Sequence, residues 1–345
     1  MNRFKRISAL LGMMILTGPA LATETLRVLA WPGYVSKEAI TRFEQQYSVT
    51  VEVIEISSDN DLWQRTQANQ GGDFDLVAIN TAELSRYINA DLVSPIRIAN
   101  IPNTRLQTRH FQKYSQIPGL ARADEIYGIP YTYSAMGLIY NRKLVSTAPT
   151  SMSALWDPKY KGRILLYDGS DHNISFTALA LGIHKPFQLD KAQFSQVVQH
   201  LLKLRDSIQK IYATPEEVVQ AFQNQDQAPA LVFANYGNQQ IQLLKKAGFD
   251  VGYAMPDEGA LAWLDCWAIM RRASNRRLAE AWINHMLGKE ASSALLREGL
   301  ANTLKEHAAP HRPGSGKLVW LEPVENSSQR AQYWERVMSG VTHAH

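Results

Sequence analysis

The chain has 345 residues, of which 45% are hydrophobic, 20% charged and 9% aromatic; this composition excludes a disordered chain and a disulfide-dense mini-scaffold. Its one cysteine, Cys266, can form neither an intrachain disulfide nor a metal site built from several thiolates. Of 36 basic and 32 acidic residues, three basic ones lie within residues 1–22, so residues 23–345 carry 33 and 32, a net charge of +1. That balance gives no support to nucleic-acid binding, which needs a clustered basic face.

The first 22 residues have the three regions of an export signal. Arg3, Lys5 and Arg6 form a basic start, residues 7–17 are mostly apolar, and Ala20-Leu21-Ala22 fits a small-x-small cleavage site. The apolar run is shorter than the roughly 20 residues that a membrane helix needs. We therefore predict a signal peptide over residues 1–22, cleavage after Ala22 and a periplasmic location; a buried N-terminal helix is the weaker alternative.

Strands and helices alternate in the next part of the chain. The spacing of apolar residues predicts strands over 26–29, 49–56 and 74–79, and helices over 36–47, 59–69 and 82–90, the last capped by Thr81. Residues 74–79 are almost all apolar, as in a strand that is buried on both faces. This order indicates a parallel sheet with right-handed crossovers.

A second α/β unit follows. Its predicted strands cover 127–133 and 136–140, joined through Ser134-Ala135, and then 163–167, 230–234, 250–254 and 267–270. Its predicted helices cover 175–181, 191–204, 239–247, 277–287, 290–297 and 328–337, and another begins at Thr214-Pro215-Glu216-Glu217, with threonine as the N-cap. Two units of similar size predict a bilobal α/β protein with a ligand cleft between the lobes.

The common enzyme motifs are absent from the sequence. It has no nucleophile elbow, zinc-protease helix, phosphate loop or dinucleotide fingerprint. Cys266 has no histidine near it in sequence, so a small buried side chain is favoured over a nucleophile. Asp171-His172-Asn173 is better interpreted as a polar loop than as a catalytic or metal set, and His343 and His345 as a solvated tail. We expect no enzymatic activity, no cofactor and no metal site.

Aromatic and acidic residues occur together where strands begin or end. Trp31-Pro32-Gly33-Tyr34 follows the first predicted strand, and Asn80-Thr81 follows the third. Trp263 and Asp265 are two residues apart, and therefore on one side of an extended segment. Aromatic faces attract cations and pack against methylene groups, while a carboxylate fixes an amine nitrogen. Core packing is the alternative for any single tryptophan, but the combination points to an organic ammonium ligand.

These residues belong to a set of motifs that resembles the periplasmic spermidine/putrescine-binding proteins of bacterial polyamine importers. The matching segments run in the same order along nearly the whole chain after residue 22: Ala30-Trp31-Pro32-Gly33-Tyr34-Val35, Phe74-Asp75-Leu76-Val77, Gly128-Ile129-Pro130-Tyr131, Leu155-Trp156-Asp157-Pro158-Lys159-Tyr160-Lys161-Gly162, Pro256-Asp257-Glu258-Gly259 and Trp263-Leu264-Asp265. The resemblance implies a two-lobed periplasmic-binding-protein fold of type II that closes around its ligand by hinge motion. It also implies crossovers near Tyr133-Ser134, Trp263 and Thr303, with one lobe over 23–133 and 265–303 and the other over 134–264 and 304–345.

The same resemblance assigns candidate ligand-binding residues. Trp31, Tyr34 and Trp263 match the family's aromatic walls, and Asp265 matches the carboxylate that holds an amine. Phe233 falls where the family has a tryptophan, and Asn80 where it has a serine. His172 replaces a glutamate that binds a terminal amine, and Asp168 and Asp171 flank it as possible substitutes. Ala82 and Leu300 replace tyrosines, Ala82 with respect to some members.

Three functional hypotheses follow. The first is a monomeric binding protein that delivers a polyamine-like cation of the putrescine/spermidine class to an inner-membrane ABC permease. The second is a periplasmic sensor that docks on a membrane signalling receptor, such as a cyclic-di-GMP enzyme or a chemoreceptor. In both, ligand binding shifts the population of the closed state. The third and weakest is an enzyme on the same fold, for which Cys266 and Asp171-His172 are the only candidate groups.

Overall fold

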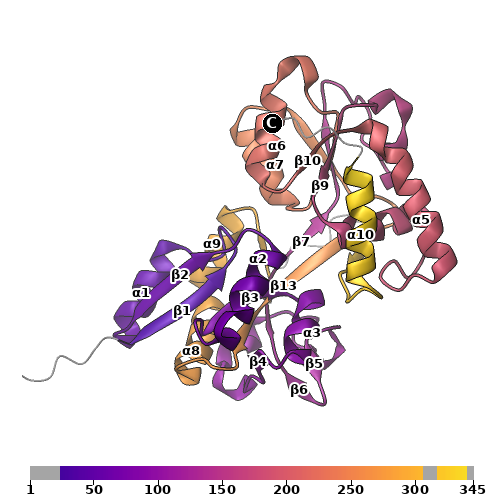
Figure 1. Cartoon of the computed structure of the whole chain (residues 1–345). Helices are drawn as coiled ribbons and strands as arrows, with labels where there is room; N and C mark the ends of the chain where they lie inside the picture. Colours follow the sequence, from indigo (N-terminus) through magenta and orange to yellow (C-terminus); the bar gives the residue numbers. More distant parts are fainter. Residues whose placement is uncertain (1–23, 306–316, 340–345) are drawn as a thin grey trace, which may run out of the picture.

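A computed structural model describes residues 24–305 and 317–339. The predicted signal peptide, its cleavage site, His343 and His345 lie outside the described residues. Two bodies, each built around its own sheet, are joined by the long strands β7 (Ile129–Met136) and β13 (Ala260–Met270) (Figure 1). Within 24–305 and 317–339, no helix is both long and apolar enough to cross a lipid bilayer.

The first sheet confirms the predicted parallel strands. Its order is β14 (Ala301–Asn302), β7, β13, β3 (Leu76–Asn80), β1 (Thr25–Ala30) and β2 (Thr50–Glu55), and β4 (Val93–Ser94) and β15 (Leu318–Trp320) also pair with β13. The strand β1 runs parallel to both β2 and β3. Helices α1 (Lys37–Tyr47), α2 (Asp59–Gln67), α3 (Thr81–Asn89), α8 (Arg276–Met286) and α9 (Lys289–Arg297) belong to this body.

Two predicted helix ends in this body are wrong. The helix predicted over 59–69 ends at Gln67, because Asn69 and Gln70 adopt positive φ angles of 48° and 50° that break the helix. The N-cap of α3 is Asn80 rather than Thr81, since the Asn80 side chain accepts a 2.9 Å hydrogen bond from the Glu83 backbone N–H.

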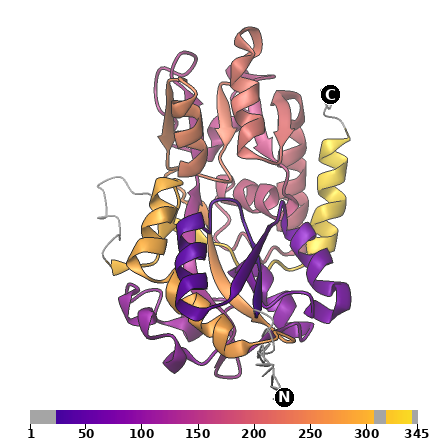
Figure 2. The ribbon, with the colours of Figure 1, turned by 90° about the vertical axis from the view of Figure 1, so that its left-hand side faces the viewer.

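The second sheet has the order β10 (Ile208–Tyr212), β9 (Ile164–Tyr167), β11 (Leu231–Phe233), β8 (Leu138–Asn141) and β12 (Val251–Ala254). The strand β10 was missed by the sequence analysis. Helices α4 (Ser170–Ala180), α5 (Lys191–Leu204), α6 (Pro215–Gln223) and α7 (Asn238–Lys246) accompany this sheet, and Thr214 caps α6 as predicted. The last helix, α10 (Ser327–Met338), packs on α4 and α5 and lies along one side of the molecule (Figure 2).

The helix α4 begins five residues before the predicted start at Ser175. Asp171 and His172 are therefore in its first turn, and the prediction of a polar loop around them is wrong. Every residue of α4 from Asn173 to Leu179 is buried, polar ones included, so the helix has no amphipathic pattern from which its length could be predicted.

The connection between the two sheets also differs from the prediction. The strand β7 continues through Ser134 and Ala135, and the break comes at Gly137 instead. A Cβ at Gly137 would lie 2.5 Å from the Ala254 carbonyl oxygen, so only glycine fits. The strand β13 is longer than the predicted 267–270 because it pairs with β7 from Leu261 to Trp267. Both strands belong to the first sheet, and they link the two bodies because β7 leads into β8 and β13 follows β12.

Candidate functional site

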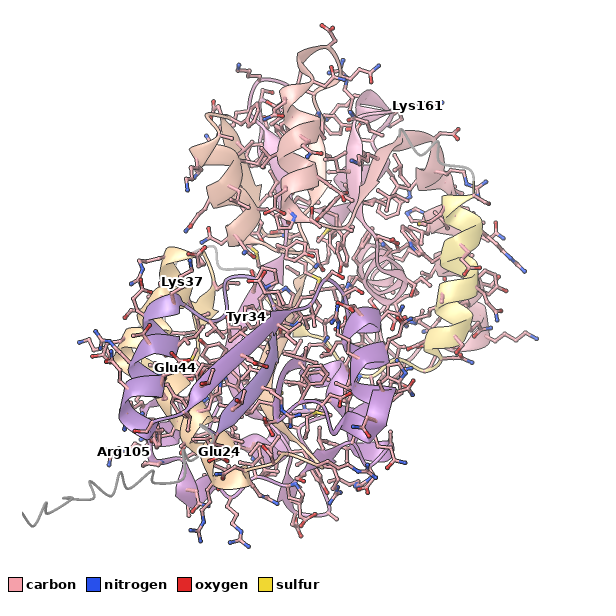
Figure 3. The ribbon with its side chains drawn as sticks, turned by 60° about the vertical axis from the view of Figure 1, so that its left-hand side comes forward. Glu24, Tyr34, Lys37, Glu44, Arg105 and Lys161 are labelled. Carbon is pink, nitrogen blue, oxygen red and sulfur yellow. The ribbon has the colours of Figure 1, made fainter. Side chains whose placement is uncertain are left out.

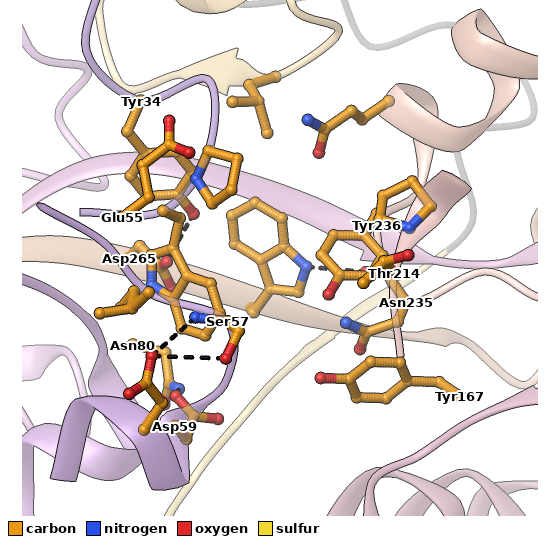
Figure 4. Close-up of a pocket in the computed structure, with 18 of the residues that line it drawn as sticks. Tyr34, Glu55, Ser57, Asp59, Asn80, Tyr167, Thr214, Asn235, Tyr236 and Asp265 are labelled. Carbon is orange, nitrogen blue, oxygen red and sulfur yellow. Dashed lines mark hydrogen bonds between the residues drawn. The ribbon is translucent and has the colours of Figure 1, made fainter. Parts of the chain in front are cut away.

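A cavity of about 560 Å³, here called the inner cavity, lies between the two bodies. Figure 4 shows its residues in two groups: Tyr34, Asp59, Asn80 and Asp265 on one side, and Tyr167, Asn235 and Tyr236 on the other. The first group, together with Trp31, comes from the first-sheet body, and we call it the first-sheet wall. Tyr167, His172, Asn235 and Tyr236 form the second-sheet wall. Most of these side chains follow the carboxyl ends of strands, where ligands of open α/β sheets bind.

A tight turn positions the aromatic residues that follow β1. The Tyr34 backbone N–H donates to the Trp31 carbonyl over 3.1 Å, and Gly33 has a φ of 82°. Proline followed by glycine at the two central positions is the signature of a type II turn. The Tyr131 hydroxyl donates to the Tyr34 carbonyl over 2.9 Å and fixes the turn to β7. As a result, Tyr34 lies at the junction of the two bodies (Figure 3).

Asp265 is the buried carboxylate of the first-sheet wall. It lies in β13 opposite Asn80 of β3, is 5% exposed, and accepts a 2.5 Å hydrogen bond from the Tyr34 hydroxyl. Burial raises the Asp265 pKa to about 7, although the hydrogen bond from Tyr34 acts to lower it. Within the described residues, no lysine or arginine forms an ion pair with Asp265. A cationic ligand would supply the missing partner.

Asp59, which the sequence analysis did not select, is a second carboxylate on this wall. It is the first residue of α2 and accepts a 3.0 Å hydrogen bond from the Asn80 side-chain amide. Burial and the nearby negative charges of Glu83, Asp265 and Asp171 raise the Asp59 pKa well above its usual value. An acid in the first turn of a helix is a common stabilising pattern, so the sequence alone gave no reason to choose it.

His172 is on the second-sheet wall, with its ring centre 5.6 Å from that of Tyr167. Burial and the positive charge of Arg330 lower the His172 pKa to about 4, so the imidazole is neutral at pH 7. Its buried Nδ1 has no hydrogen-bond partner among the described residues. His172 therefore brings no charge to the cavity in place of the glutamate expected from the family.

Asn235 and Tyr236 were also missed. They follow β11, and the Asn235 carbonyl accepts a 2.9 Å hydrogen bond from the Trp263 indole N–H. The Tyr236 hydroxyl donates to the Ala213 carbonyl over 2.7 Å, so its ring is held on the second-sheet wall. Phe233, the predicted ring, does not line the inner cavity; it is fully buried with its ring centre 4.4 Å from that of Phe176. The aromatic ring that reaches the cavity thus comes three residues later.

Asp168 and Asp171 lie beside a neighbouring outer cavity rather than the inner one. Asp168 Oδ1 accepts a 2.8 Å hydrogen bond from the Trp334 indole N–H, and Asp171 Oδ2 accepts a 3.1 Å hydrogen bond from the Ser327 hydroxyl. Burial raises the Asp171 pKa, and the Arg330 charge acts to lower it. Both carboxylates accept hydrogen bonds from α10 and neither lines the inner cavity, although the charge of Asp171 acts on Asp59.

The remaining candidates fit a binding site better than a catalytic one. Cys266 is fully buried, its thiol donates to the Ile79 carbonyl over 3.2 Å, and burial raises its pKa well above the usual value, so it has no nucleophilic character. Leu300 and Trp263 line the inner cavity, whereas Ala82 lies by the outer one. In the part of the chain that the structure describes, no three His, Cys, Asp or Glu side chains are grouped for a metal ion.

The electrostatics of the inner cavity favour a cation. Asp59 and Asp265 face aromatic rings, and the arginine at the rim, Arg65, is already paired with Asp61 over 2.6 Å. Rings and carboxylates around a water-poor space are the features that bind organic ammonium groups. The arrangement can hold an amine by charge and pack its methylene groups between rings.

Known proteins resemble this chain over most of its length. The putrescine-binding periplasmic protein PotF of Escherichia coli is 23% identical over 290 residues, covering 80% of this chain and 77% of that protein. A putrescine/cadaverine-binding protein of Pseudomonas aeruginosa is 21% identical over 351 residues, covering 95% and 93%. The crystal structure of a spermidine/putrescine ABC transporter substrate-binding protein from Streptococcus pneumoniae superposes with a TM-score of 0.74 at 21% identity, covering 92% and 99%.

The likeness to solved structures confirms the two-lobed α/β periplasmic-binding-protein fold of type II. Residues 38–311 match the family model described as bacterial extracellular solute-binding protein. The chain belongs to the bacterial extracellular solute-binding protein family, a family of binding proteins rather than enzymes.

Proposed function

We propose that this protein captures a polyamine-like cation of the putrescine/spermidine class and delivers it to an ABC importer in the inner membrane. The observation that carries this proposal is the pair Asp59 and Asp265, two carboxylates that face aromatic rings with no lysine or arginine bound to either in the described residues. The names of the relatives from Escherichia coli and Pseudomonas aeruginosa, which describe binders of putrescine or cadaverine, support the same ligand class.

In this proposal the ligand is held by charge and by rings. Asp265 accepts hydrogen bonds from an ammonium group, and the remaining ligand-binding residues are Trp31, Tyr34, Asn80, His172 and Trp263, to which we add Asp59, Asn235 and Tyr236. A charge-assisted hydrogen bond in a desolvated site contributes about 1.5–3 kcal/mol. The cavity of about 560 Å³ is within the range of small-molecule sites.

The mode of action is part of the same proposal. The lobes comprise 23–133 with 265–303 and 134–264 with 304–345, and they close by hinge motion where β7 and β13 pass between them. The protein is exported by a signal peptide cleaved after Ala22 and works as a periplasmic monomer. The closed, liganded form is the one that docks on the permease.

Calorimetric titration tests the proposal. The protein is unfolded and refolded to remove any bound ligand, and its fold is checked by circular dichroism before titration with putrescine, spermidine, norspermidine and spermine. We expect at least one of these amines to bind with micromolar or tighter affinity. Absence of heat with all of them, from folded protein, would overturn the assignment of a polyamine-class ligand.

A further inference from the structure

The two walls of the inner cavity offer different chemistry to a ligand. Asp59 and Asp265 are carboxylates on the first-sheet wall. On the second-sheet side, the polar side chains that line the cavity are hydroxyls, amides and an imidazole: Tyr167, His172, Thr214, Asn235, Tyr236 and Gln239. The one carboxylate in the lining there, Glu216, is on an exposed residue. An exposed charge is screened by water and contributes little to the energy of an ion pair. The buried part of this wall is therefore uncharged.

Asn235 carries an unfulfilled hydrogen-bond requirement. The residue is 6% exposed, lines the inner cavity, and its side-chain oxygen has no partner among the described residues. Its backbone is held on both sides, since the N–H donates to the Tyr212 hydroxyl over 3.0 Å and the carbonyl accepts from Trp263. A buried polar atom without a partner is costly, so a ligand group that bonds to it gains the full benefit.

His172 is a second buried residue of this wall with an unpaired hydrogen-bonding atom. As a neutral imidazole it has one donor and one acceptor nitrogen, and its buried Nδ1 has no partner among the described residues. A primary amide such as that of Asn235 also has both a donor and an acceptor. An ammonium group has donors only and is held most strongly by carboxylates, whereas an amide or hydroxyl group of a ligand can use both the donors and the acceptors of His172 and Asn235.

The nearby acids do not restore a charge to this wall. Asp168 and Asp171 accept hydrogen bonds from Trp334 and Ser327 of α10, and both lie by the outer cavity. A second ammonium group at the second-sheet wall would thus lose its water without gaining a buried carboxylate. Such an unpaired buried charge is strongly unfavourable.

We propose that the preferred ligand is an amine with a single ammonium group, held at Asp59 and Asp265, and an uncharged amide end that bonds to Asn235 and His172. The substrate class is a mono-N-acylated diamine rather than a free diamine. This inference rests on the proposed function, because it assumes that the cavity binds an organic amine, and it assigns which member of that class fits best.

The direct test compares two ligands of the same carbon chain. Putrescine carries two ammonium groups, and N-acetylputrescine replaces one of them with an amide. Titration calorimetry on the refolded full-length protein should show N-acetylputrescine binding at least about tenfold more tightly, the value of one charge-assisted hydrogen bond. Equal affinities or tighter binding of putrescine would overturn the inference and leave the proposed function standing. Binding of neither amine, nor of spermidine, would overturn both.

A charge placed on the second-sheet wall should remove the preference for N-acetylputrescine. The substitution Asn235→Asp adds a carboxylate where the second ammonium group of putrescine would lie, and we expect putrescine to gain at least about tenfold relative to N-acetylputrescine. The matched control is Asn224→Asp, the same change at an exposed residue outside the inner cavity, which should leave the ratio of affinities unchanged.

A second variant keeps this test decisive if Asn235→Asp does not fold. His172→Glu introduces the same charge from α4, near Arg330, and should shift the ratio in the same direction. An unchanged ratio in a folded variant of either kind would overturn the role given to the second-sheet wall.

Discussion

The two walls of the inner cavity differ in what they do to a ligand: one attracts cations, and the other distinguishes one cation from another. On the first-sheet wall, Asp265 and Asp59 keep carboxyl groups among aromatic rings. Burial raises both pKa values, and repulsion from neighbouring acids raises that of Asp59 further. On the second-sheet wall, burial likewise favours the uncharged form and lowers the His172 pKa to about 4, so His172 offers no charge to a ligand at pH 7. One wall therefore draws in cations in general, and the other distinguishes among them by the group at their far end.

Removing the charge of Asp265 should have the largest effect on this contrast. Asp265→Asn keeps the shape of the side chain and an acceptor for the Tyr34 hydroxyl, but it removes the charge that holds an ammonium group. We expect affinity for any cationic ligand to fall about ten- to a hundredfold. Calorimetry measures the affinity, and thermal melting checks the fold, which should change much less.

The control for this variant is Asp250→Asn, which removes an exposed carboxylate paired with Arg142. It should leave affinity unchanged. If Asp265→Asn bound amines as tightly as the control does, Asp265 would not be the anchor.

The raised pKa of Asp265 predicts a pH dependence of binding. A protonated carboxyl must lose its proton before it can pair with an ammonium group, so affinity should decrease by up to about tenfold per pH unit below pH 7. Titrations between pH 5.5 and 8, in amine-free buffers of different ionisation enthalpy, would detect the proton released on binding. Asp265→Asn should lose the part of this dependence that Asp265 contributes and keep the part that comes from Asp59.

The stability of the ligand-free protein should change in the opposite direction. The folded protein holds the Asp265 proton up to about pH 7, whereas the unfolded chain loses it near the ordinary aspartate pKa of 3.8. The contribution of Asp265 to the free energy of unfolding is thus largest below pH 4 and declines as the pH rises towards 7. The measurement compares the free energy of unfolding of the wild type with that of Asp265→Asn at each pH. A difference that does not change with pH would contradict the burial that we assign to Asp265.

Asp59→Asn should have a smaller effect on affinity, because the Asn80 amide can still bond to its side chain. We expect about a tenfold loss for cationic ligands. The ligand-free variant should also melt at a higher temperature than the wild type at pH 8, since one of several repelling acids is gone. Asp73→Asn, an exposed acid outside both cavities, is the control and should show neither change.

The substitution Phe233→Leu tests whether the Phe233 ring packs in the core or contacts the ligand. Phe233 is buried against Phe176, so its truncation should lower the free energy of unfolding by about 0.5–3 kcal/mol. Affinity for amines should stay within about twofold of the wild type. If Phe233→Leu lost more affinity than Tyr236→Leu does, then Phe233 rather than Tyr236 would be the aromatic residue that contacts the ligand.

Asp168→Asn is expected to have the smallest effect. Its carboxylate is exposed and is bonded to Trp334 rather than directed into the inner cavity. Affinity measured by calorimetry should be unchanged, and the melting temperature should fall only slightly. A clear loss of affinity for diamines would mean that Asp168 reaches the ligand in the closed form and compensates for His172.

Short-range patterns predicted the elements of the fold well, because helices and strands are recognised from neighbouring residues. The start of α6 at Thr214 followed from a local cap signal, and the helix α5 was predicted over its full length. The failures occurred where packing decides the limits. The strand β13 is extended by its pairing with β7, and α4 is lengthened by burial of its first turns.

The sequence by itself determined the family and the pair Trp263 and Asp265, since residues two apart in a strand share a face. It assigned residues 127–133, 267–270, 277–287 and 290–297 to the second unit, whereas they belong to the first-sheet body. Only the tertiary structure decided which other side chains meet them. Tyr34 and Asp265 are 231 residues apart, and Asp59, Asn235 and Tyr236 reach the cavity because the ends of separate strands converge there. The same convergence buries Phe233 and ties Asp171 to α10. Local periodicity carries no information on contacts across such separations, so the chemistry of the second-sheet wall became visible only in the folded molecule.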